Sequence, residues 1–212
     1  MNFDGVIHSH VLEHIYQPQK FLKTIYSYLS DSGYHIFSIP NFQKMLDKKY
    51  TNMLNFEHTI FLNEKLVDFL LIQNGFKIIK KKKFLSDHSI FYCTKKNLSK
   101  NKFNLNFHFN NENKFYNYFK FQQETSLRIN QKIAKIDLSK NHVFIFSAHV
   151  FTQYLFAFGL NDKVILNILD NDKNKHNLRL YGTKLYVRSP KIIKNYKNPV
   201  IITRHVGVYK RE

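Results

Sequence analysis

The first fifteen residues contain the pattern that most limits how this chain can fold. A short apolar run, Phe3 to Ile7, is followed by the polar residues His8-Ser9-His10 and then by Leu12-Glu13-His14. This order predicts a strand, a loop at its carboxyl end and the entry to a helix. It therefore indicates an α/β sheet, in which the carboxyl ends of strands are the usual ligand-binding positions.

The alternation of strands and helices continues through the N-terminal half. Apolar residues at helical spacing predict helices over 18–29 and 62–74, and Asp31-Ser32-Gly33 is expected to end the first. Strands are predicted at 34–39, 76–79 and 89–94, the last two joined by a basic turn and Ser86-Asp87-His88. Residues 1–98 are therefore assigned to one α/β domain whose sheet ends in an antiparallel hairpin.

A second α/β unit is predicted after a linker and a helix over residues 99–140. An apolar strand at 142–146 is followed by a helix at 150–158, and further strands are expected at 164–169 and 200–203. Residues 141–212 are assigned to this small Rossmann-like domain. Its first turn, Phe146-Ser147-Ala148-His149, contains no glycine, so a working dinucleotide site is not predicted there.

The charge of the chain allows two interpretations. Lys and Arg number 33 against 15 Asp and Glu, a formal net charge of +18. Attraction to phosphate in nucleic acids, nucleotides or membranes is one interpretation. The other is codon bias, because the chain is rich in Lys, Asn, Ile, Phe and Tyr. The lysines are dispersed, so a nucleic-acid partner is not expected, and the run Lys80 to Lys83 is interpreted as a solvated strand edge.

Two absences in the sequence bear on location. Cys93 is the single cysteine, which excludes a disulfide framework and fits a reducing compartment. The start of the chain lacks the basic and apolar regions of a signal peptide, and no apolar run is long enough for a transmembrane helix. A cytoplasmic location is the expectation.

Residues 3–94 resemble the C-terminal half of class I S-adenosylmethionine-dependent methyltransferases. The matching segments are Phe3-Asp4-Gly5-Val6-Ile7, Leu12-Glu13-His14, Gly33 and Ser38-Ile39-Pro40-Asn41. In that family the first segment is the fourth strand of the sheet, and the loop after it lies beside the cofactor. The resemblance implies S-adenosylmethionine as cofactor, with His8, Ser9 and His10 near the sulfonium. Loop polarity, with helix capping by Ser9, is the alternative interpretation.

The second half resembles the C-terminal domain of sugar C-methyltransferases, which act on nucleotide-linked deoxysugars. The resemblance rests on the order of five blocks: Phe146-Ser147-Ala148-His149, Leu169-Asp170-Asn171, Leu180-Tyr181-Gly182-Thr183, Val187 with Ser189-Pro190, and Gly207-Val208-Tyr209. It implies a sugar or sugar nucleotide as methyl acceptor and a role in surface polysaccharide synthesis.

The chain departs from that family in what precedes Phe3. The family's Gly-rich cofactor loop, its acidic ribose-binding residue and its clustered zinc-binding cysteines have no counterpart in this sequence. The expectation is that this polypeptide is the downstream part of a longer enzyme. It would then pair with a chain that carries the remaining half, or with a second copy of itself.

The resemblance also assigns the candidate site residues. In sugar C-methyltransferases a Glu-His pair removes a proton next to a carbonyl, which implies His58 as the general base and Glu57 as its support. The alternative is that Glu57-His58 is a helix-entry dipeptide with His58 bonded to the backbone. Glu13 and His14 are expected to cap and brace a helix. Four residues are assigned to the acceptor side: Asn41, His88, Lys175 and Arg179.

Alternatives remain open for the metal content and the activity. His8, His10 and His14 do not converge at their spacing unless the loop folds back, so no metal site is predicted. For Lys175 and Arg179 a solvated surface is the alternative to a phosphate contact. For the whole chain the alternatives are an inactive remnant or partner-dependent subunit, a basic nucleic-acid-binding module, and an O-methyltransferase acting on a small metabolite.

Overall fold

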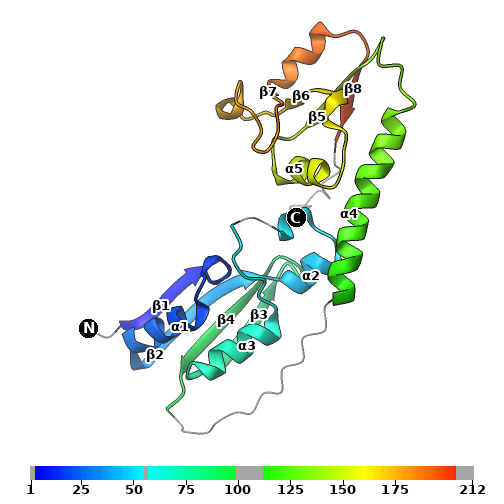
Figure 1. Ribbon diagram of the computed structural model, residues 1–212. Coiled ribbons are helices and arrows are strands. Elements are labelled where there is room, and N and C mark those ends of the chain that lie inside the picture. Colours follow the sequence, from blue (N-terminus) through cyan, green and yellow to red (C-terminus); the bar gives the residue numbers. More distant parts are fainter. Residues whose placement is uncertain (1–2, 55–56, 99–111, 204–212) are drawn as a thin grey trace. The chain divides into compact units, whose positions relative to one another are not determined.

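A computed structural model describes residues 3–54, 57–98 and 112–203 (Figure 1). The chain forms two compact units, Met1–Phe115 and Tyr116–Glu212, which are taken in turn. Each contains a sheet with helices packed on it, so the predicted mixed α/β class is confirmed. The segments 99–111 and Gly207-Val208-Tyr209, which carried part of the sequence interpretation, lie outside the described residues.

The sheet of the first unit has the strand order β1-β2-β4-β3. β1 and β2 are parallel, and β4 pairs antiparallel with both β2 and β3, which confirms the predicted terminal hairpin. The strands alternate with two main helices in the predicted order. The elements are β1 (Phe3–Ser9), α1 (Pro18–Tyr28), β2 (Leu29–Pro40), α3 (Glu64–Gln73), β3 (Phe76–Phe84) and β4 (Ser89–Lys96).

The expected end of the first helix is wrong. α1 ends at Tyr28, and Asp31-Ser32-Gly33 lies inside β2. Leu29 leaves the helix with extended backbone, pairs with Phe3 of β1 and is fully buried. Gly33 is required in the strand for another reason, because a Cβ there would lie 2.9 Å from the carbonyl oxygen of Phe3.

The lysine run belongs to a strand and not to the turn that was expected. Lys80 to Lys83 continue β3, and the connection to β4 consists of residues 85–88. β3 is the last strand in the sheet order, so the prediction of a charged strand edge is confirmed. Charged residues on an edge strand discourage pairing with another chain.

One face of this sheet is covered by helices. α1 and α3 lie on the same side of it in Figure 1 and contribute Leu22, Val67 and Leu71 to a core that includes Phe37 of β2 and Tyr92 of β4. Successive strand residues point to opposite faces of the sheet, so every second side chain lies on the face away from these helices. That face carries the exposed apolar residues Ile7, Tyr34, Ile36 and Phe91.

A compact segment between β2 and α3 was not predicted from the sequence. It contains α2 (Phe42–Asp47) and a 3-10 helix (Thr51–Met53). Asn41 caps α2, since its side chain accepts a hydrogen bond from the Lys44 N–H. A second 3-10 helix (Leu12–His14) follows β1 and is separate from α1, so Leu12-Glu13-His14 forms its own turn.

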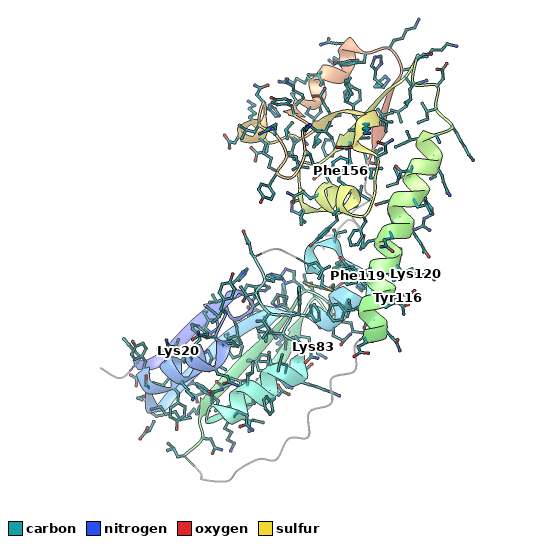
Figure 2. All side chains as sticks on the ribbon, viewed as in Figure 1. Lys20, Lys83, Tyr116, Phe119, Lys120 and Phe156 are labelled. Atoms are coloured by element: carbon teal, nitrogen blue, oxygen red, sulfur yellow. The ribbon has the colours of Figure 1, made fainter. Side chains whose placement is uncertain are left out.

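Basic residues of the first unit lie on more than one element. Figure 2 shows Lys20 on α1 and Lys83 on β3. On β3 the lysines face acidic residues of α3, and the Nζ of Lys81 lies 2.7 Å from Glu64 and 2.8 Å from Asp68. Part of the positive charge is therefore neutralised within the unit.

The second unit has a parallel sheet of order β7-β6-β5-β8. Its strand order reverses between β5 and β8, which is the topological switch point of a doubly wound sheet. α4 crosses the boundary of the units, and its Ser126 donates to the Leu155 carbonyl of α5 at 3.0 Å. The main elements are α4 (Glu112–Ile133), β5 (His142–Phe146), α5 (Val150–Ala157), β6 (Ile165–Leu169), β7 (Val187–Arg188) and β8 (Pro199–Ile202).

Within the described ranges, no helix combines the length and the apolar composition needed to cross a bilayer.

Candidate functional site

The candidate site begins where β1 and β2 end together. The strands are parallel with Ser9 opposite Ser38, so their carboxyl ends share one edge of the sheet. His10 follows β1 with left-handed backbone (φ 51°), and its N–H donates to the Ser38 carbonyl at 3.0 Å. This turn sends the chain across the sheet edge and into the 3-10 helix that contains Glu13.

Glu13 has a buried side chain without a hydrogen-bond partner among the described residues. The residue is 2% exposed, and neither of its carboxylate oxygens receives a hydrogen bond. Nδ1 of His10 lies 3.3 Å from one of these oxygens. The backbone is anchored separately, because the Glu13 carbonyl accepts the Thr59 N–H at 2.9 Å. A loop 46 residues away in the sequence is therefore hydrogen-bonded to the backbone of Glu13.

His14 and His58 face each other beside Glu13, with ring centroids 5.1 Å apart. Nδ1 of His14 donates to the backbone carbonyl of Glu57 at 2.8 Å. His58 hydrogen bonds to the backbone of Met53. Burial lowers the pKa of His58, and this effect exceeds the opposing attraction of Glu13 for the protonated ring. Glu13, His14 and His58 are called the Glu13 cluster below.

The Glu13 cluster borders a small hollow that is open to solvent. Glu13 and His58 are the ionisable residues in its lining, and the other lining residues are apolar. α2 supplies Phe42 and Met45, and the loop before α3 supplies Phe61. The hollow thus places two charge-bearing groups against a mostly apolar wall, the usual composition of a small-molecule site.

The residues predicted to lie beside the cofactor have different surroundings from one another. His8 points to the covered face of the sheet, where its Nε2 lies 2.9 Å from Nε2 of His35 and its ring contacts Phe21 of α1. Ser9 is exposed, and its hydroxyl lies 2.7 Å from that of Ser38. His10 joins the Glu13 cluster to β4 through a hydrogen bond of 2.8 Å to the Ser89 hydroxyl.

Two of the residues assigned to the acceptor side form hydrogen bonds in the loops around the site. Asn41 is buried and donates its side-chain N–H to the Ser86 carbonyl at 2.9 Å, in addition to capping α2. Nδ1 of His88 hydrogen bonds to the Ser89 hydroxyl, and its ring packs against His10 at 5.8 Å. Of these two, His88 therefore lies next to a residue that contacts the Glu13 cluster.

In the second unit, the turn after β5 is hydrogen-bonded to side chains of the same unit. Asp170, which follows β6, accepts the Ala148 N–H at 2.8 Å and the Asp172 N–H at 2.9 Å. Nζ of Lys175 lies 3.2 Å from the same carboxylate and 3.2 Å from the Ala148 carbonyl. Arg179 is exposed and forms a backbone bridge with Tyr186.

Sequence reasoning gave Glu13 and His14 a structural role and did not connect them with His58. The structure brings all three together, whereas the side chain of Glu57 is exposed and its carbonyl holds His14. The Leu12-Glu13-His14 motif was visible as a signal. Its contact with residue 58 spans 45 positions and needed the fold.

No family model matches the chain, and no curated protein matches it. Among solved structures it is similar to an S-adenosylmethionine-dependent methyltransferase from Clostridium acetobutylicum ATCC 824, with 15% identity and a TM-score of 0.37 over 44% of this chain and 58% of that one. It is also similar to magnesium protoporphyrin IX methyltransferase from Synechocystis PCC 6803 with bound SAH, with 18% identity and a TM-score of 0.35 over 45% of each chain. The chain spans about half the length of these structures.

Proposed function

We propose that this chain takes part in the transfer of a methyl group from S-adenosylmethionine to a sugar or sugar nucleotide, in cytoplasmic steps of surface polysaccharide synthesis. The observation that carries the proposal is that Glu13 and His58 line one hollow near the carboxyl ends of β1 and β2, with His14 beside them. The sequence resemblance implies that the cofactor and the acceptor bind at this edge of the sheet. The acceptor is the finer part of the proposal and rests on the resemblance alone.

The chemistry needs a group that removes a proton from the acceptor. Attack on the methyl carbon forms a new bond from the acceptor atom and breaks the bond between sulfur and carbon, which leaves S-adenosylhomocysteine. The acceptor proton goes to His58, whose ring borders the hollow.

The cofactor side of the proposal uses the last residue of β1 and the loop that follows it. Ser9 is exposed beside Ser38, and His10 turns the chain with left-handed backbone at the sheet edge. We assign the sulfonium end of S-adenosylmethionine to this loop. β1 is also the first strand in the sheet order, and its Ile7 is 76% exposed. A partner chain or a second copy adding to this edge is the proposed source of further cofactor contacts.

The first test is a calorimetric titration of the 212-residue chain with S-adenosylhomocysteine. Micromolar affinity is the expected result. Absence of binding at millimolar ligand contradicts the proposal for this polypeptide, and the same titration with the candidate partner chain present then decides whether the site is shared.

The second test measures transfer of labelled methyl groups to a panel of nucleotide-linked sugars. His58→Asn is expected to lower the turnover rate by about 100-fold or more while the affinity for S-adenosylhomocysteine is retained. The matched control is His149→Asn, because His149 is exposed in the other unit. A His58 variant with the turnover of the unaltered chain contradicts the assigned role.

A further inference from the structure

The three side chains of the Glu13 cluster each place a possible metal-ligand atom near the other two. One ligand atom from each of Glu13, His14 and His58 lies within 4.8 Å of the others. Ligand atoms around a tetrahedral zinc ion are about 3.4 Å apart, since each bond is about 2.1 Å long. A shift of roughly 1 Å in the side chains would bring the three atoms to that spacing.

Both histidines are already held in the way that metal-binding histidines are held. Nδ1 of His14 donates to the Glu57 carbonyl, which leaves Nε2 with a lone pair. The ring of His58 hydrogen bonds to the backbone of Met53 through one nitrogen, which leaves the other. Histidines that bind metals usually donate their second ring N–H to a backbone carbonyl or a carboxylate, because this fixes the tautomer and the orientation of the ring.

The carboxylate of Glu13 lacks the partners that a buried charge requires. Burial of an ionised carboxylate is costly unless hydrogen bonds or an opposite charge compensate for it. Both oxygens lack hydrogen bonds among the described residues, and the residue is 2% exposed. His10 approaches one oxygen at 3.3 Å, where it can orient the carboxylate from outside the cluster. A cation between Glu13, His14 and His58 would supply the missing charge.

We propose that Glu13, His14 and His58 bind one divalent cation of the zinc class, with a fourth position open toward the hollow. Two histidines and one carboxylate form a donor set that catalytic zinc sites use with an open position. This donor set also suits other first-row divalent ions, so ion selectivity depends on availability. Hydrophobic residues line the rest of the hollow, so the open position is left for an oxygen of a bound molecule.

The cation deepens the proposed function and rests on it for its role in catalysis. A cation bound here would take the lone pair of His58, so His58 would act as a ligand and no longer as the general base. The acceptor, coordinated through an oxygen, would then give its proton to solvent water that reaches the open hollow. The open position binds a hydroxyl or carbonyl oxygen of the acceptor and polarises it. The acceptor class is thereby narrowed to molecules that carry such an oxygen beside the methylated atom.

The test is titration of the metal-free, full-length chain with Zn²⁺ by calorimetry and with Co²⁺ by visible absorption, which reports the coordination geometry. One ion per chain is expected, with affinity at least about 100-fold weaker in Glu13→Gln, His14→Gln and His58→Asn. His149→Asn is the matched control and keeps the affinity. His10→Gln, which alters the orienting contact with Glu13 and also the hydrogen bond to Ser89, is expected to weaken binding about 10-fold.

Circular dichroism of each variant verifies that loss of binding is not loss of folding. Absence of Zn²⁺ binding at millimolar ion overturns the inference, as does equal binding by the three ligand variants. The S-adenosylhomocysteine titration is independent of these results. A chain that binds S-adenosylhomocysteine but no cation refutes the cation site alone, and a chain that binds the cation but no S-adenosylhomocysteine refutes the methyltransferase proposal alone.

Discussion

At the scale of single residues, Glu13 is expected to destabilise the metal-free fold, and it is also a proposed metal ligand. Its carboxylate is buried without hydrogen bonds among the described residues. Replacement by the neutral, nearly isosteric glutamine is expected to stabilise the metal-free first unit by about 1–3 kcal/mol, because the cost of burying a charge disappears. Chemical denaturation of Glu13→Gln and the unaltered chain, both in the presence of a chelator, measures this difference. A clear loss of stability would show that the carboxylate has a structural function.

The buried histidine pair on β1 and β2 predicts a pH-dependent stability. Burial lowers the pKa of His8 to about 4 and that of His35 to about 3. The charge of Glu13 has a smaller, opposing effect on the pKa of His8, and His8 lowers the pKa of His35 further. Unfolded histidines take up protons below about pH 6.5. The unfolded chain therefore binds more protons than the folded chain between about pH 6.5 and pH 3. Stability is expected to be complete above that range and to fall as the pH decreases through it.

His35→Phe tests this pH dependence directly. The ring of His35 stacks on Phe37 at 4.6 Å between centroids, so phenylalanine fits the same surroundings. The variant should lose less stability than the unaltered chain between pH 7 and pH 4, because one group no longer takes up a proton on unfolding. The measurement is the denaturation midpoint of the first unit at both pH values. Parallel losses in the two proteins would refute the prediction.

Only some of the candidate site residues could be identified from the sequence. His58 was selected through the resemblance, and the structure places it at the hollow. The partnership of His58 with Glu13 depends on the path of the chain between α2 and α3, which has little periodic pattern to interpret. His8 was assigned to the cofactor because it follows a strand, and alternation along β1 turns its ring toward His35.

At the scale of elements, the two faces of the first sheet differ in what they contribute. Phe37 on the covered face is 1% exposed, and Phe91 on the opposite face is 42% exposed. Phe37→Ala is expected to destabilise the first unit by about 3–5 kcal/mol. Phe91→Ala should cost no more than about 1 kcal/mol, because much of this ring already contacts water. Denaturation curves of the two matched variants test the difference, and equal losses would mean that both faces are packed.

The regular elements were predictable where the apolar period was long or clear. The strand at 142–146 and the helix that begins at Pro18 agree with the sequence interpretation. The first strand was also predicted, but it continues through His8 and Ser9, which were expected in the loop after it. α2 has six residues and β7 has two, which is too short for a periodic signal. The boundary at Leu29 was wrong because pairing with β1 outweighs the turn signal of Asp31-Ser32-Gly33.

At the scale of the whole molecule, the two units have separate cores. One core includes Phe37, and the other includes Ile145. Units with their own cores are expected to unfold in separate transitions. Phe37→Ala should lower one calorimetric transition and Ile145→Ala the other. A single transition that both variants shift equally would show that the units unfold together.

The topology was predictable only in its class. Alternating elements predict α/β sheets, and the antiparallel hairpin follows from two adjacent strands with a short connection. In the order β7-β6-β5-β8, the position of β8 depends on pairing with β5 across more than 50 residues, as Val143 pairs with Val200. Local patterns do not encode such pairing, so the switch point between β5 and β8 became visible only in the structure.

The contacts of Lys175 matter for the choice of compounds to screen against this protein. Its ammonium group is bound to Asp170, and the carboxylate of Asp170 is held by two backbone N–H groups. An incoming phosphate at this turn meets a charge pair that is already neutral, and it gains little by replacing one of the partners. Fragment libraries rich in phosphate mimics are therefore a poor choice for the second unit. Metal-chelating fragments such as hydroxamates, directed at Glu13 and its neighbours, are the better starting chemistry.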